Sequence, residues 1–187
     1  MWGEILVKKN GSILIVEDRL QEKIGSFYDQ LVKNGYDIEI GENFEKANEL
    51  LENLLKSNKI DGIILDFSFP VSEEDQSVNI DGIPSGVKLL QDYLFKLNMR
   101  RIPVVINTTG DEEYKAKYLE NMGLSMPVYN VNHETNPLAK PGAQMISEIM
   151  EMFDIRNNER RIKPDSKWFN KGGPFIRDAN GNIIGYR

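Results

Sequence analysis

Short apolar runs alternate with longer amphipathic segments along most of the chain. Five runs have the length and aliphatic character of buried strands, and they lie at residues 13–16, 36–40, 60–65, 102–106 and 127–131. The segments between them carry apolar residues three and four positions apart, which is the spacing of a helix that packs on a sheet by one face. This order predicts five consecutive β/α units.

The predicted helices carry apolar stripes and local end signals. A first helix over residues 19–33 is expected to stop at Asn34-Gly35, and Ser85 is placed to cap a third. The stripes are Leu20, Ile24, Phe27 and Leu31; Ala47, Leu51, Leu54 and Leu55; Val87, Leu90, Leu94 and Leu97; and Met145, Ile146, Ile149, Met150 and Phe153. We expect these faces to cover a sheet.

The predicted strands are hydrophobic at consecutive positions rather than at alternate ones. Runs such as ILIV and IIL indicate burial on both faces, which is typical of a parallel sheet between two layers of helices. The predicted fold class is therefore α/β, with a doubly wound five-stranded parallel sheet. In such sheets ligands bind beyond the carboxyl ends of the strands, so the residues that directly follow each strand are the candidates for function.

Chemically active side chains follow several of the predicted strands. Glu17 and Asp18 come after the first strand, Asp66 after the third, Thr108 after the fourth and Lys140 somewhat after the fifth. Each alone has an ordinary structural role, as a helix cap, a loop carboxylate, a turn hydroxyl or a solvated charge. Together they are expected at one edge of the sheet, where three carboxylates repel one another unless a cation or raised pKa values relieve them.

A hard divalent ion suits this acidic cluster because such ions prefer oxygen ligands, and Mg²⁺ is the best candidate. Bound Mg²⁺ in turn recruits phosphate. A carboxylate that attacks phosphorus forms an aspartyl phosphate, while the ion and a lysine offset charge on the phosphoryl oxygens. Asp66 is the natural nucleophile in this arrangement.

Four segments, in this order, resemble the response-regulator receiver family of two-component signalling. They are ILIVED (13–18), DGIILDFSFP (61–70), IPVVINTT (102–109) and KPGAQMISEI (140–149). The resemblance covers about residues 12–153. It implies a flavodoxin-like strand order of 2-1-3-4-5, the order that chemotaxis receivers share with flavodoxin.

The resemblance also implies a ligand set and a partner. Mg²⁺ would be held by the carboxylates of Glu17, Asp18 and Asp66 and by the backbone carbonyl of Ser68. Asp66 would accept a phosphoryl group from a phosphohistidine on a histidine kinase or phosphotransfer protein.

Two further residues take roles from the same resemblance. Lys140 would pair with the phosphoryl group, and Thr108 would turn its hydroxyl toward it. That movement would bias a two-state surface beside the fourth helix, which is predicted after Thr109 and Glu112.

The chain departs from the usual receiver pattern in two places. The loop after Asp66 is enlarged over residues 67–84, and it either screens the site, forms a partner surface or is a tolerated insertion. The usual lysine position falls near Asn130, whereas a lysine-proline pair occurs only at Lys140. We favour Lys140; with Asn130 in the site, the phosphoryl group would lack its cation.

Charge and composition narrow the classes of partner. Acidic residues outnumber basic ones 29 to 23, and a net charge of −6 disfavours broad binding to DNA or to an anionic membrane surface. The absence of cysteine and the presence of one histidine, His133, exclude thiolate and multi-histidine metal sites. No apolar run approaches the roughly 18–20 residues that span a bilayer, and no secretory signal is apparent. We therefore expect a cytoplasmic protein.

The composition changes near residue 155. Residues 156–187 hold eight Lys/Arg and three Asp/Glu, a net charge of +5. We predict an N-terminal extension over residues 1–11, a receiver domain over 12–155 and a basic C-terminal tail over 156–187. The tail is too short for the usual DNA-binding output domain. A homodimer through the tail or through the fourth-helix face is left open.

The end of the tail is predicted to form a β-hairpin. Asn180-Gly181 is a strong signal for a tight turn. With that turn Phe175 faces Tyr186, and Arg177 faces Ile184.

Three functions are compatible with parts of this pattern. The first is a phosphoacceptor response regulator that catalyses its own Mg²⁺-dependent phosphorylation and dephosphorylation. The second is an atypical receiver-like interaction module that no longer uses phosphorylation. The third, a flavin- or nucleotide-binding protein, is disfavoured because Glu17-Asp18-Arg19 offers no glycine-rich phosphate cradle. We expect the first.

Overall fold

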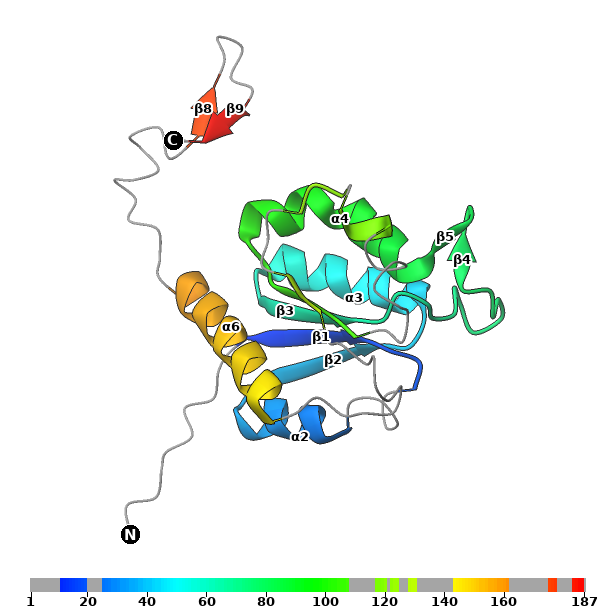
Figure 1. The fold of residues 1–187 in the computed structure, drawn as a ribbon, viewed down its shortest axis with the longest axis horizontal. Coiled ribbons are helices and arrows are strands. Elements are labelled where there is room, and N and C mark those ends of the chain that lie inside the picture. Colours follow the sequence, from blue (N-terminus) through cyan, green and yellow to red (C-terminus); the bar gives the residue numbers. More distant parts are fainter. Residues whose placement is uncertain are drawn as a thin grey trace.

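A five-stranded parallel sheet forms the centre of the computed structural model (Figure 1). The structure describes residues 11–19, 25–107, 117–120, 122–124, 128–130, 143–161, 175–177 and 183–186. The strands are β1 (Ser12–Val16), β2 (Asp37–Gly41), β3 (Ile60–Leu65), β6 (Val104–Ile106) and β7 (Val128–Asn130). Their spatial order is β2-β1-β3-β6-β7 and every neighbouring pair is parallel, which confirms the predicted order 2-1-3-4-5.

Helices cover both faces of this sheet. Figure 1 shows α3 (Phe44–Ser57) and α4 (Ser85–Arg100) on one face, and α2 (Gly25–Lys33) and α6 (Ala143–Arg161) on the other. Of the predicted fourth helix, residues 117–119 are described and are helical. The doubly wound architecture is therefore confirmed. No helix in the described ranges is long and apolar enough to cross a bilayer.

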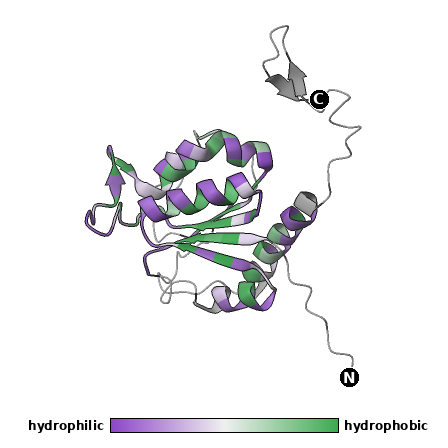
Figure 2. Ribbon diagram, turned by 180° about the vertical axis from the view of Figure 1, so that it is seen from behind, coloured by the Kyte–Doolittle hydropathy of each residue, from purple (hydrophilic) through white to green (hydrophobic). Residues whose placement is uncertain are grey.

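The apolar residues of the central strands pack into two separate hydrophobic cores, one on each face of the sheet. All five residues of β1 are buried. Leu14 and Val16 belong to the core under α3 and α4, whereas Ile13 and Ile15 belong to the core under α6. Alternate side chains of a strand point to opposite faces, so residues 13–16 of a strand covered on both sides are apolar at consecutive positions. Figure 2 shows this apolar character along the strands and on the helices that cover them.

Ser85 does not cap α4, contrary to the prediction. Pro84 occupies the position before the helix and makes no side-chain capping hydrogen bond, and Ser85 is the first helical residue. Its hydroxyl is hydrogen-bonded to the backbone of Phe69 instead. The predicted apolar stripe of this helix is confirmed, since Val87, Leu90 and Leu97 are buried and Leu94 packs against the core.

The fourth strand of the sheet begins later than predicted, at Val104 rather than Ile102. The N–H of Ile102 donates to the carbonyl of Leu97 at the end of α4, over 3.1 Å. Pro103 follows and has no N–H to donate to a ladder. Ile102 therefore bonds back to the end of the helix, and Pro103 contributes only its carbonyl to the sheet, where it accepts from the N–H of Ile63 over 3.0 Å.

The predicted C-terminal hairpin is present, but one of its two predicted residue pairs is wrong. Its antiparallel strands are β8 (Phe175–Arg177) and β9 (Ile183–Tyr186). Phe175 pairs with Tyr186 as predicted, but Arg177 pairs with Ile183 rather than Ile184. The ladder shifts by one residue just before Arg177, which is how a bulge places two residues of one strand opposite one of the other. The Asn180-Gly181 turn lies outside the described residues.

The last helix continues six residues past the domain boundary predicted at residue 155. α6 ends at Arg161, and Arg156 and Asn157 within it are buried. The side-chain amide of Asn157 donates to the buried carboxylate of Asp61 at the start of β3, over 2.5 Å. The predicted tail therefore begins with two buried residues of this helix.

Candidate functional site

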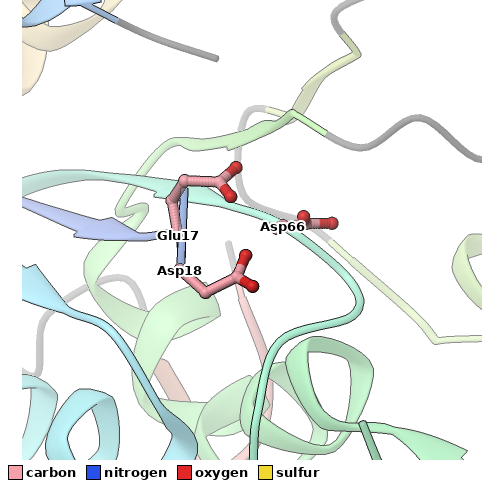
Figure 3. A group of neighbouring side chains, drawn as sticks. All are labelled: Glu17, Asp18 and Asp66. Carbon is pink, nitrogen blue, oxygen red and sulfur yellow. The ribbon is translucent and has the colours of Figure 1, made fainter. Parts of the chain in front are cut away.

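Three carboxylates meet beyond the carboxyl ends of two adjacent strands (Figure 3). Glu17 and Asp18 directly follow β1, and Asp66 directly follows β3. The two strands end side by side, since the last residue of β1 pairs with the last residue of β3. One carboxylate oxygen of each residue lies within 4.8 Å of the others. The structure therefore brings together the three acidic residues that the sequence placed at this edge.

Two of the three residues in the cluster are buried, and the third is exposed to solvent. Glu17 is 1% exposed and Asp66 is 3% exposed, whereas Asp18 is exposed and lies 3.7 Å from the guanidinium of Arg19. The backbone N–H of Arg19 donates to Glu17 Oε1 over 3.1 Å, and the N–H of Ser68 donates to Asp66 Oδ1 over 3.2 Å. Carboxylates held this close with little access to water favour a bound cation.

The donor chemistry of this cluster fits Mg²⁺. All three side chains offer oxygen, and hard divalent cations are bound by carboxylates, backbone carbonyls and water. Mg²⁺ keeps several of its waters when it binds to proteins. Of the three carboxylates, that of Asp18 is the one exposed to solvent.

The backbone that carries Asp66 packs tightly against the first turn of α4. The N–H of Gly86 donates to the carbonyl of Phe67 over 3.0 Å. A Cβ atom on Gly86 would lie 2.1 Å from the carbonyl oxygen of Asp66 and 2.9 Å from Cα of Phe67. Only glycine allows α4 to approach the backbone of residues 66 and 67 this closely, because the atoms that a Cβ would meet are backbone atoms, which cannot turn aside.

Gly86→Ala is therefore expected to lower the free energy of unfolding by about 1–3 kcal/mol, the usual cost of overpacking a tight site. Relief of the clash requires α4 to move away from the end of β3. Urea denaturation, monitored by circular dichroism, measures the change. An unaltered unfolding midpoint would contradict the close approach of α4 to residue 66.

The enlarged loop after Asp66 is hydrogen-bonded to the start of α3. The carbonyls of Pro70 and Val71 accept hydrogen bonds from the N–H groups of Phe44 and Glu45, over 2.9 and 3.1 Å. These donors are at the start of α3, where a helix has N–H groups without helical partners. The loop thereby connects the acidic site to the beginning of α3.

The sequence interpretation missed a second hairpin in this loop. β4 (Asn79–Ile80) and β5 (Ile83–Pro84) pair antiparallel around Asp81 and Gly82, whose φ angles are +53° and +76°. Two positive φ angles in a two-residue turn define a type I′ hairpin, for which Asp-Gly is a preferred sequence. The signal was therefore present in the sequence.

The outer part of the same loop carries exposed acidic residues. Glu73, Glu74 and Asp75 are all exposed. The backbone N–H of Ser77 donates to Asp75 Oδ1 over 2.9 Å. This hydrogen bond and a second one from the Ser77 side chain lower the pKa of Asp75. The outer loop therefore carries three exposed acidic side chains in a row.

Two of the predicted site residues, Thr108 and Lys140, lie outside the described residues. Asn130, the alternative to Lys140, is the last residue of β7, and its backbone pairs with Ile106 at the same edge of the sheet. The choice between Lys140 and Asn130 stays a prediction, as does the role of Thr108.

Comparison with known proteins gives matches among solved structures. No family model matches the sequence, and no curated protein matches it. A response regulator receiver domain protein from Clostridium thermocellum superposes with a TM-score of 0.52 at 15% identity, over 81% of this chain and 98% of the other. The signal receiver domain of a modulated diguanylate cyclase from Desulfovibrio desulfuricans G20 gives a TM-score of 0.50 at 16% identity, over 82% and 98%. The similarity lies in the fold.

Proposed function

Since the chain has the receiver-domain fold, we propose that it is a phosphoacceptor response regulator of a two-component phosphorelay. Asp66 receives the phosphoryl group from a histidine kinase or a phosphotransfer protein. One observation carries this proposal: three carboxylates lie with oxygens within 4.8 Å of one another where β1 and β3 end. Such a cluster at the edge of a doubly wound sheet stands where these folds bind their ligands.

The proposed ion site consists of side-chain and backbone oxygens. The carboxylates of Glu17, Asp18 and Asp66 would hold Mg²⁺. The backbone carbonyl of Ser68 would be a fourth protein ligand. When bound, the ion neutralises the cluster and offsets charge on the phosphoryl oxygens.

Asp66 supplies the nucleophile. A carboxylate oxygen of Asp66 forms a bond to phosphorus while the bond between phosphorus and the imidazole nitrogen of the donor breaks, and the released imidazole takes up a proton from water. The product is an acyl phosphate. Water later attacks phosphorus, which returns the Asp66 carboxylate and inorganic phosphate. Because Asp66 is 3% exposed, its surroundings limit the access of water.

The remaining predicted residues complete the proposal. Lys140 pairs with the phosphoryl oxygens, and the hydroxyl of Thr108 turns toward them. Phosphorylation then favours one of two conformations of the surface beside the predicted fourth helix, which follows Thr109 and is a different element from α4.

Intact-mass measurement after incubation with acetyl phosphate tests the proposal. With Mg²⁺ present, we expect a mass gain of one phosphoryl group, and with the ion removed by a chelator we expect none. Binding of beryllofluoride in the presence of Mg²⁺ provides a second readout without covalent transfer. A folded protein that gains no phosphoryl group from any donor would contradict the proposal and favour the receiver-like interaction module.

A further inference from the structure

Ser85 connects the start of α4 to the loop that follows Asp66. Its side chain is fully buried. The hydroxyl donates to the carbonyl oxygen of Phe69 over 2.6 Å and accepts from the N–H of the same residue over 3.2 Å. A hydroxyl suits this position because it can donate one hydrogen bond and accept others at the same time.

These contacts act on the backbone of Ser68, the proposed fourth ligand. The N–H of Phe69 belongs to the same peptide group as the carbonyl of Ser68. A trans peptide is planar, with its C=O and N–H in opposite directions, and the described residues contain no cis peptide. The hydrogen bond to Ser85 therefore fixes the direction of the Ser68 carbonyl.

Ser68 is held from its other side as well. Its own N–H donates to Asp66 Oδ1 over 3.2 Å. Both peptide groups that flank Ser68 thus have fixed partners, one in the carboxylate cluster and the other in Ser85. Neighbouring backbone support comes from Gly86, whose N–H donates to the carbonyl of Phe67.

We infer that Ser85 is a positioning residue for the cation site, one that orients the Ser68 carbonyl toward a divalent ion held by Glu17, Asp18 and Asp66. This inference rests on the proposed function. The hydrogen bond to Ser85 also polarises the peptide group and makes its oxygen a better ligand. Loss of a hydrogen bond that orients a metal ligand typically lowers metal affinity about 10- to 100-fold.

Calorimetric titration with Mg²⁺, in the absence of any phosphodonor, measures this effect on the full chain. Ser85→Ala is expected to weaken the binding of Mg²⁺ about tenfold or more. Ser57→Ala is the matched control. The Ser57 hydroxyl also donates to backbone carbonyls, those of Asn53 and Leu54, but at the end of α3 remote from its start beside the loop. The Ser57→Ala protein should bind Mg²⁺ with the same affinity as the natural chain.

The outcomes separate this role from a merely structural one. A Ser85→Ala protein that is less stable to urea but binds Mg²⁺ as tightly as the natural chain would overturn the inference and leave the proposed function standing. Absence of Mg²⁺ binding in the natural chain would overturn both. Should Ser85→Ala not fold, Ser85→Cys replaces it, because the thiol is close in size and accepts hydrogen bonds only weakly. Unchanged affinity in Ser85→Cys would likewise overturn the role of Ser85.

Discussion

Asp66→Asn is expected to abolish the gain of a phosphoryl group from acetyl phosphate in the presence of Mg²⁺. The amide is close to the carboxylate in size and keeps an oxygen that can accept the N–H of Ser68, so the local backbone should persist. An amide, however, is not the anionic nucleophile that attack on phosphorus requires. It also removes one of the three negative charges that favour the cation. Intact-mass spectrometry of both proteins under the same conditions measures the result.

Asp29→Asn is the control for this experiment. Asp29 is exposed on α2, on the surface of the domain, and its substitution changes the net charge of the protein by the same amount. We expect its phosphorylation to match that of the natural chain. Retention of one phosphoryl group in Asp66→Asn would place the acceptor on another residue and would contradict the proposed chemistry.

The fold was predictable because a parallel sheet covered on both faces leaves a distinctive sequence pattern. Ile13 and Leu14 are neighbours in sequence but belong to different cores, so both positions are apolar. The stripe on α3 was equally clear, since Ala47, Leu51, Leu54 and Leu55 all lie buried on one side. In both cases each residue's local preference agrees with its tertiary environment.

The acidic part of the site was predictable from topology. Parallel strands that are adjacent in the sheet end at the same edge, so residues that follow β1 and β3 are brought together although they lie far apart in sequence. The lysine position was not predictable in the same way. The segment between the fifth strand and the last helix has no periodic pattern that fixes its register, and both Asn130 and Lys140 satisfy part of the receiver pattern.

Other errors came from partners that are distant in sequence. Ser85 precedes an apolar helical stripe, which predicts a cap, but the carbonyl and N–H of Phe69 are placed beside it by the fold. The register of Arg177 depends on a bulge, which a short turn signal does not specify. A hydrogen-bonding side chain can satisfy either a local or a tertiary partner, and only the packed structure decides between them.

Phe153→Ala is expected to lower the free energy of unfolding by about 3–5 kcal/mol, the usual cost of removing a fully buried phenylalanine. The Phe153 side chain of α6 is fully buried and covers Gly62 of β3, where a Cβ atom would lie 2.2 Å from the ring. The ring also packs edge to face with Tyr36, with 6.4 Å between centroids. Urea denaturation compares the variant with Phe95→Ala, which removes a side chain 73% exposed on α4 and should change stability by less than about 0.5 kcal/mol. Equal effects of the two substitutions would contradict the packing of α6 on the strand that carries Asp66 at its end.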